Sequence, residues 1–211
     1  MLELGVFMNG QTDLPVRQTP TGTVLPSGSL ADMHASYQRG VLNQIKQGVL
    51  AEKLGFDYLW PVEHHFQPEG AEFSPNPMLM EMAVAAQTSR IRLGQYANIL
   101  TWWHPLRIAE QAAMLDVVSG GRLDVGIGRG GTLQDYQTFQ SDRADAVCDL
   151  QANQITLRVL LCGVGGASVF GARAWRTCMR LQQRHRPLDC RPWRTRPPMP
   201  SWTCSARAGY A

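Results

Sequence analysis

The chain has 211 residues, of which 44% are hydrophobic and 18% charged, the composition of an ordinary globular protein. It contains no apolar run of about 20 residues, which argues against a membrane-spanning protein. Its formal net charge of +3 arises in one segment only. Residues 141–211 hold 11 Arg against 4 Asp, whereas residues 1–140 hold 9 basic and 13 acidic residues. The charge therefore does not indicate nucleic-acid binding by the chain as a whole.

The N-terminal region predicts a strand, a long loop and a helix. Residues 2–8 form a strand-like run without the basic start and apolar stretch of a secretory signal, so we expect a cytoplasmic protein. Residues 9–40 are rich in Thr, Pro, Gly and Ser, which predicts a long loop. Apolar residues then recur at helical spacing from Val41 to Leu54, and Gly55 stands where a helix commonly ends.

Three further strands are predicted to alternate with two helices. The segment MLMEMAVAA is apolar almost all round, which predicts a buried helix. The next helix is predicted to begin at Pro105 and to stop at Ser119-Gly120-Gly121. The predicted elements are strand 56–62, helix 76–88, strand 91–99, helix 105–118 and strand 123–127.

This order predicts a parallel sheet with helical crossovers. An open doubly wound sheet and a closed (β/α)8 barrel both fit, and both place their chemistry at the carboxyl ends of the strands. The most unusual residues stand there: Glu63-His64-His65 after the second strand, Asn98 near the end of the third, and Gly128-Arg129-Gly130-Gly131 after the fourth. This coincidence predicts an active site.

Two adjacent histidines beside a carboxylate allow several functions. In an extended chain Glu63 and His65 share one side, and His64 points to the other. Binding of one metal ion by both histidines would need a sharp bend, and no further ligand follows at a recognisable spacing, so we predict no metal site. A histidine that moves a proton or binds an anion, and one that only satisfies a loop carbonyl, both remain open.

The glycine-rich run 120–131 could contact an anion. The spacing of Gly126, Gly128 and Gly130 does not match the dinucleotide-binding motif, and no P-loop Lys-Ser/Thr follows. Glycines allow close approach of backbone amides, and the Arg129 guanidinium can bind a phosphate with two hydrogen bonds. A simple strand-to-helix turn explains the run equally well. For His104, after two tryptophans, we favour the start of a helix over a substrate wall.

Together the segments AEKLGFDYLWPVEHHF, ANILTWWHPLRIAEQAAMLDVVSGGRLDVGIGRG and DYQTF resemble the bacterial luciferase-like family of flavin-dependent monooxygenases. The resemblance implies a TIM-barrel type (β/α)8 fold, of which the four visible strands are the N-terminal half. It implies that His64 is the active-site histidine near the flavin ring. It further implies that Asn98 lies at the ring and that Arg129, with Gly128 and Gly130, binds the flavin phosphate.

The resemblance also implies a reaction. Reduced FMN would react with molecular oxygen to oxidise a small organic substrate, with a flavin reductase as the source of reduced flavin, and a homodimer is compatible with it. No nucleic acid and no membrane are expected as partners. One alternative is a deazaflavin-dependent hydride transfer on the same fold, and another is a non-catalytic flavin-binding remnant.

The resemblance covers residues 1–146, and residues 147–211 differ in composition. This segment is rich in Arg, Cys, Trp and Pro and contains neither Lys nor Glu. A basic nucleic-acid-binding tail would use such residues, whereas a zinc module would need paired cysteine spacings that are absent. A shifted reading frame gives the same composition, and we favour it, expecting a truncated and weakly active chain.

Overall fold

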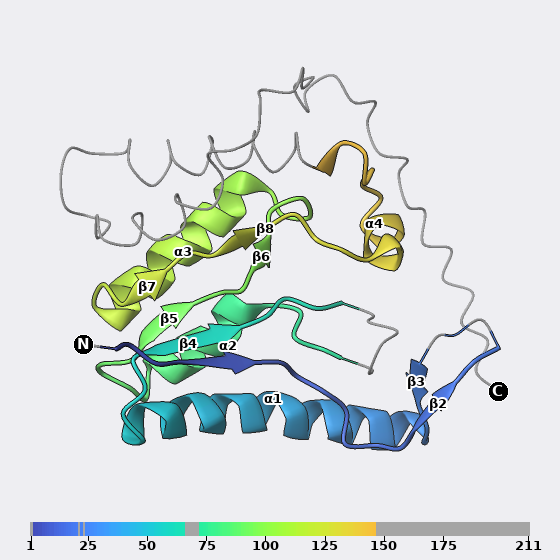
Figure 1. Ribbon diagram of the computed structural model, residues 1–211, viewed down its shortest axis with the longest axis horizontal. Helices are drawn as coiled ribbons and strands as arrows, with labels where there is room; N and C mark the ends of the chain where they lie inside the picture. The colour runs from blue at the N-terminus through green and yellow to red at the C-terminus, as the bar shows by residue number, and fades with distance from the viewer. Residues whose placement is uncertain (1, 21, 23, 66–71, 147–211) are drawn as a thin grey trace, which may run out of the picture.

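The computed structural model describes residues 2–20, 22, 24–65 and 72–146 (Figure 1). The interpretation of 147–211 as a separate irregular segment therefore lies outside the described residues. The elements in chain order are β1 (Gly5–Met8), β2 (Val16–Gln18), β3 (Val24–Pro26), α1 (Leu30–Lys53), β4 (Tyr58–Pro61), α2 (Pro77–Ala85), β5 (Arg92–Gly94), β6 (Asn98–Ile99), α3 (Pro105–Ser119), β7 (Leu123–Asp124), β8 (Ile127–Gly128) and α4 (Leu133–Thr138).

The central sheet is parallel and has the strand order β1-β4-β5-β7. Helices α1, α2 and α3 connect its successive strands, and α2 contacts both α1 and α3 (Figure 1). Each new strand is added on the same side, without the reversal of order that marks a doubly wound sheet. This is the arrangement of four successive units of a (β/α)8 barrel, and it selects the barrel from the two folds that the sequence left open.

Two strands that the sequence predicts as continuous are interrupted. The predicted strand 91–99 divides into β5 and β6, and the predicted strand 123–127 divides into β7 and β8, with β6 and β8 paired in parallel. Between β5 and β6 the backbone crosses very close to Gly126, where a Cβ atom would stand 1.7 Å from the carbonyl oxygen of Gln95. The glycine permits this crossing, after which Asn98 pairs with Ile127 of β8.

The predicted loop 9–40 is wrong in its second half. Helix α1 begins at Leu30, and a short antiparallel hairpin of β2 and β3 precedes it. The helix starts there because Ser29 Oγ accepts a hydrogen bond from Asp32 N, while the Asp32 carboxylate accepts one from Ser29 N. The capping box and the helical spacing of Leu30, Met33, Tyr37 and Val41 are both sequence signals, and the polar composition of the segment masked them.

The hydrophobic core lies between the sheet and the helices. Leu59, Leu93 and Leu123 stand in register on neighbouring strands and are almost completely buried. They belong to one cluster with buried residues of the three long helices, including Val84 of α2 and Leu115 of α3. The alternation of a strand places the intervening residues on the opposite face.

That opposite face of the sheet carries aromatic residues. Tyr58 and Trp60 stack at a ring distance of 5.7 Å, and the Trp60 indole lies across Gly5 and Gly94 of the flanking strands. Phe7 is 61% exposed. The face that a closed barrel would turn inward is therefore rich in aromatic surface.

No helix in the described ranges is long and apolar enough to cross a membrane.

Candidate active site

Glu63, which follows β4, joins two strand ends. Its side chain is fully buried and accepts hydrogen bonds from Ile99 N and from the indole Nε1 of Trp103, both at 2.8 Å. The same carboxylate lies 2.9 Å from His65 Nε2. Glu63 and His65 thus share one side of the extended chain, as the sequence predicted, and all three contacts give this carboxylate a structural role.

His65 is held in an aromatic environment. Its ring meets Trp102 and Phe139 edge to face at 5.5 and 4.8 Å. Burial raises the pKa of the Asp135 carboxyl of α4, while its hydrogen bond with Thr132 and the neighbouring histidines His65 and His64 partly oppose the rise. These contacts fix His65 as part of the packing between the loop and α4.

His64 has different surroundings. Its backbone pairs with Ser74 in an antiparallel bridge, and its Nδ1 lies 3.6 Å from the Glu72 carboxylate. Glu72 also accepts a hydrogen bond of 2.6 Å from Asn9 Nδ2, just beyond β1. The His64 side chain keeps 29% of its surface exposed. Of the two histidines, His64 has the more exposed side chain, and Glu72, which sequence reasoning missed, lies beside its ring.

Asn98 is buried at the start of β6. Its Nδ2 donates to Gln95 Oε1 at 2.7 Å and to the carbonyl oxygen of Gly126 at 3.2 Å. Gln95 Nε2 in turn donates to the carboxyl of Glu81 on α2. Sequence reasoning missed both Gln95 and Glu81, although a single acidic residue within the apolar run MLMEMAVA was a visible signal.

The loop after β8 presents Arg129. Its carbonyl oxygen accepts hydrogen bonds from Thr101 Oγ1 at 2.9 Å and from the Tyr136 hydroxyl at 2.7 Å. The backbone is therefore fixed on two sides, while the Arg129 side chain is exposed and takes part in no ion pair with another described residue. Gly130 has a φ of +87° and packs against Trp102, so its backbone conformation and close packing already explain why a glycine stands there.

These contacts bring the three strand ends into one unit. Glu63 binds the backbone of Ile99, the neighbour of Asn98, and Thr101 binds the backbone of Arg129. Within the described ranges, no hydrogen bond or ion pair joins the side chains of His64, Asn98 and Arg129 directly. Those ranges also contain no group of three His, Cys, Asp or Glu residues placed to hold a metal ion.

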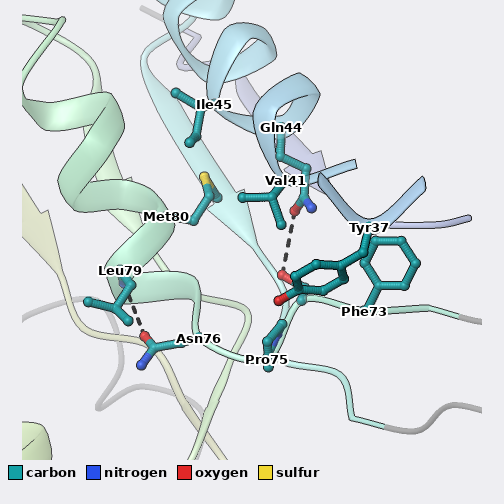
Figure 2. Close-up of a pocket in the computed structure, with 10 residues that line it drawn as sticks. Tyr37, Val41, Gln44, Ile45, Phe73, Pro75, Asn76, Leu79 and Met80 are labelled. Carbon is teal, nitrogen blue, oxygen red and sulfur yellow. Dashed lines mark hydrogen bonds between the residues drawn. The ribbon is translucent and has the colours of Figure 1, made fainter. Parts of the chain in front are cut away.

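A separate cavity of about 240 Å³ lies between α1 and α2 (Figure 2). Gln44 stands at its wall and accepts a hydrogen bond of 3.5 Å from Ser74 Oγ, and the rings of Tyr37 and Phe73 meet at 4.8 Å. The remaining lining is largely apolar. His64, Asn98 and Arg129 do not line this cavity, although Ser74 connects it to the backbone of His64.

Several motif residues instead serve the fold. His104 is the N-cap of α3, where its Nδ1 accepts a hydrogen bond from Leu106 N, which confirms the interpretation as a helix start. Arg122 of the SGGR motif is buried and donates to the carbonyl oxygens of Ala85 and Thr88, at the end of α2. This part of the pattern is explained by packing and needs no ligand.

Comparison with known proteins identifies a family match. Residues 19–187 match the family described as luciferase-like monooxygenase. The oxygenase component of the flavin-dependent trigonelline monooxygenase from Acinetobacter baylyi is 38% identical over 88 residues, 42% of this chain and 24% of that protein. The alkanal monooxygenase alpha chain from Photorhabdus luminescens is 35% identical over 98 residues, 46% of this chain and 26% of that protein.

A solved structure agrees with these matches. Monooxygenase RslO1 from Streptomyces bottropensis is 33% identical with a TM-score of 0.56, over 59% of this chain and 37% of that one. The chain spans about a third or less of the curated relatives that it matches, between 24% and 32% of their length.

Proposed function

The chain belongs to the luciferase-like monooxygenase family, and we propose that it acts in a flavin-dependent monooxygenase reaction in which reduced FMN and molecular oxygen oxidise a small organic substrate. The observation that carries the proposal is the joining of three strand ends, through Glu63 and Thr101, into one unit that bears His64, Asn98 and Arg129. Relatives named as flavin-dependent and alkanal monooxygenases support it.

The region around Arg129 fits a phosphate. Hydrogen bonds to Thr101 and Tyr136 hold the backbone, and the exposed guanidinium remains available for an anion. A guanidinium binds phosphate with two parallel hydrogen bonds, which fixes orientation as well as charge. Gly128 and Gly130 keep side chains out of the same loop, so backbone amides can approach the anion.

The aromatic face of the sheet fits a flat ring. Phe7 near the end of β1 and Tyr96 beyond β5 are 61% and 68% exposed, and their rings meet edge to face at 6.1 Å. A planar apolar ring placed on this pair would remove their surface from water. The flavin, when bound, supplies the redox chemistry and the activation of oxygen.

The protein side of the reaction centres on His64. The Glu72 carboxylate lies on the Nδ1 side of its imidazole, which leaves Nε2 to hold or to move a proton. His65 has no such freedom, because Glu63 and two aromatic rings enclose it. We therefore assign proton transfer to His64 and support of the loop to His65.

The partners follow from the same proposal. The trigonelline relative is named an oxygenase component, which supports a separate flavin reductase as the source of reduced FMN. A homodimer and a cytoplasmic location stay predictions. Deazaflavin-dependent hydride transfer is the rival reaction on this fold, and it differs in needing no oxygen.

The test combines binding with oxygen consumption. The full chain is titrated anaerobically with photoreduced FMN, then mixed with aerated buffer containing trigonelline or a long-chain aldehyde as probe substrates. We expect saturable flavin binding and oxidised product formed in step with oxygen uptake. Turnover under strict anaerobiosis with a deazaflavin would overturn the proposal in favour of the rival, and absence of binding by either flavin would overturn both.

A further inference from the structure

Helix α2 carries a carboxyl group that no part of the proposed reaction uses. Glu81 is fully buried, and its hydrogen bond comes from the side-chain amide of Gln95. The second carboxyl oxygen, Oε1, has no hydrogen-bond partner among the described residues. A buried carboxyl with one amide partner is costly for a protein to maintain, which suggests a purpose beyond packing.

The contacts of Glu81 lead directly to Asn98. Gln95 donates to Glu81 through Nε2 and accepts from Asn98 Nδ2 through Oε1, so the amide of Gln95 is held at both ends. The second hydrogen of Asn98 Nδ2 is directed to the carbonyl oxygen of Gly126. Both amide hydrogens of Asn98 are thereby used inside the protein. The atom of Asn98 that remains for a ligand is the acceptor oxygen Oδ1.

The surroundings favour a neutral carboxyl. Among the described residues no Lys or Arg acts on the pKa of Glu81, and the charged group that does is the carboxylate of Asp124, which pairs with Arg92. Burial raises the pKa of Glu81 well above its ordinary value, and Asp124 acts in the same direction, against the hydrogen bond from Gln95. A protonated carboxyl keeps its carbonyl oxygen as the acceptor that Gln95 needs.

We propose that Glu81 is a positioning residue: its carboxyl anchors the amide of Gln95, and Gln95 fixes the amide of Asn98 so that the acceptor oxygen Oδ1 would be the atom presented to a flavin. The inference rests on the proposed function, because it assumes that Asn98 meets the flavin. It adds the element that determines which end of the Asn98 amide is presented, donor or acceptor. It also explains an acidic residue within an otherwise apolar helix.

Substitution of Glu81 separates positioning from packing. Glu81→Gln keeps a carbonyl oxygen for Gln95, and we expect the dissociation constant for FMN to stay within about twofold. Glu81→Met keeps the volume but removes the acceptor, so Gln95 and then Asn98 can rotate, and we expect FMN binding to weaken about tenfold, the effect of one hydrogen bond. Glu110→Met, at an exposed carboxylate on α3, is the matched control and should leave binding unchanged.

A second measurement needs no destabilising variant. The carboxyl ¹³C resonance of Glu81, identified by its absence in Glu81→Gln, should report a protonated group from pH 5 to 8 in the flavin-free chain. Titration of this resonance at an ordinary carboxyl pKa would overturn the inference, as would FMN binding by Glu81→Met equal to that of the unmodified protein. Failure of the unmodified chain to bind flavin would instead overturn the proposed function, so the two failures are distinguishable.

Discussion

Replacement of Glu63 tests whether this carboxylate is structural rather than catalytic. Glu63 is fully buried and lies within hydrogen-bonding distance of Ile99 N, Trp103 Nε1 and His65 Nε2. Glu63→Ala leaves these groups without their shared acceptor in a place that water enters poorly. Glu63→Gln keeps one oxygen but turns an amide group toward at least one N–H donor.

The contacts set the magnitude. Each buried donor left without a partner costs about 1 kcal/mol or more, so Glu63→Ala should lower the free energy of unfolding by about 3 kcal/mol. For a chain of this size, that corresponds to a fall in Tm of about 6–12 °C. Glu63→Gln should cost about 1–3 kcal/mol, because the new amide N–H group would face one of the N–H donors and leave it without an acceptor.

The assay is urea denaturation of the full chain, followed by tryptophan fluorescence and checked by thermal melting. Glu110→Gln serves as the control, because Glu110 forms an exposed ion pair with Arg107 whose loss should change stability by less than about 0.5 kcal/mol. A Glu63→Ala protein as stable as this control would refute the structural assignment. Glu63 would then be open to a role in the chemistry.

Three further predictions concern the other assigned residues. His64→Ala should lower turnover about a hundredfold while the FMN dissociation constant stays nearly unchanged, as measured by stopped-flow kinetics and fluorescence titration; equal turnover would remove His64 from the mechanism. Arg129→Ala should raise the dissociation constant for FMN about tenfold or more, with little effect on riboflavin, which lacks the phosphate, and equal losses for both ligands would contradict phosphate binding. Burial alone would raise the pKa of Glu52, but N–H groups of three successive residues beginning at Ser89 outweigh it and lower the pKa. The stabilisation by Glu52 is therefore present above the ordinary pKa of about 4.5, and it is lost as the pH falls through the lower pKa of the folded state. The difference in unfolding free energy between the unmodified chain and Glu52→Gln, measured by urea titration, should shrink between pH 6 and pH 3.

The sequence was informative where periodicity and end signals coincide. Gly55 and Gly120 have positive φ where glycines were expected to end helices, and α3 begins at Pro105 as predicted. The placement of Glu63 and His65 on one side followed from strand alternation alone. These features depend on neighbours in the chain, which is why local patterns disclose them.

The interrupted strands and the Glu81 network could not be predicted in the same way. The division of the third strand depends on Gln95 passing Gly126, a residue 31 positions later. The surroundings of His64 include Glu72, which is itself bonded to Asn9 beyond β1. Such contacts join distant parts of the chain, and no periodicity in a single sequence encodes them.

The position of Trp60 couples residues that a sequence comparison would treat separately. Its indole covers Gly5 and Gly94, where Cβ atoms would stand 2.9 and 2.2 Å from the ring, so one large side chain fills the space of three positions on neighbouring strands. A larger residue at either glycine can be accommodated only if position 60 becomes smaller. Among relatives, positions 5, 60 and 94 should therefore vary together: a larger residue at one position should be accompanied by a smaller residue at another, so that their combined side-chain volume stays constant. Residues on this face of the sheet should thus change as a group and not one at a time.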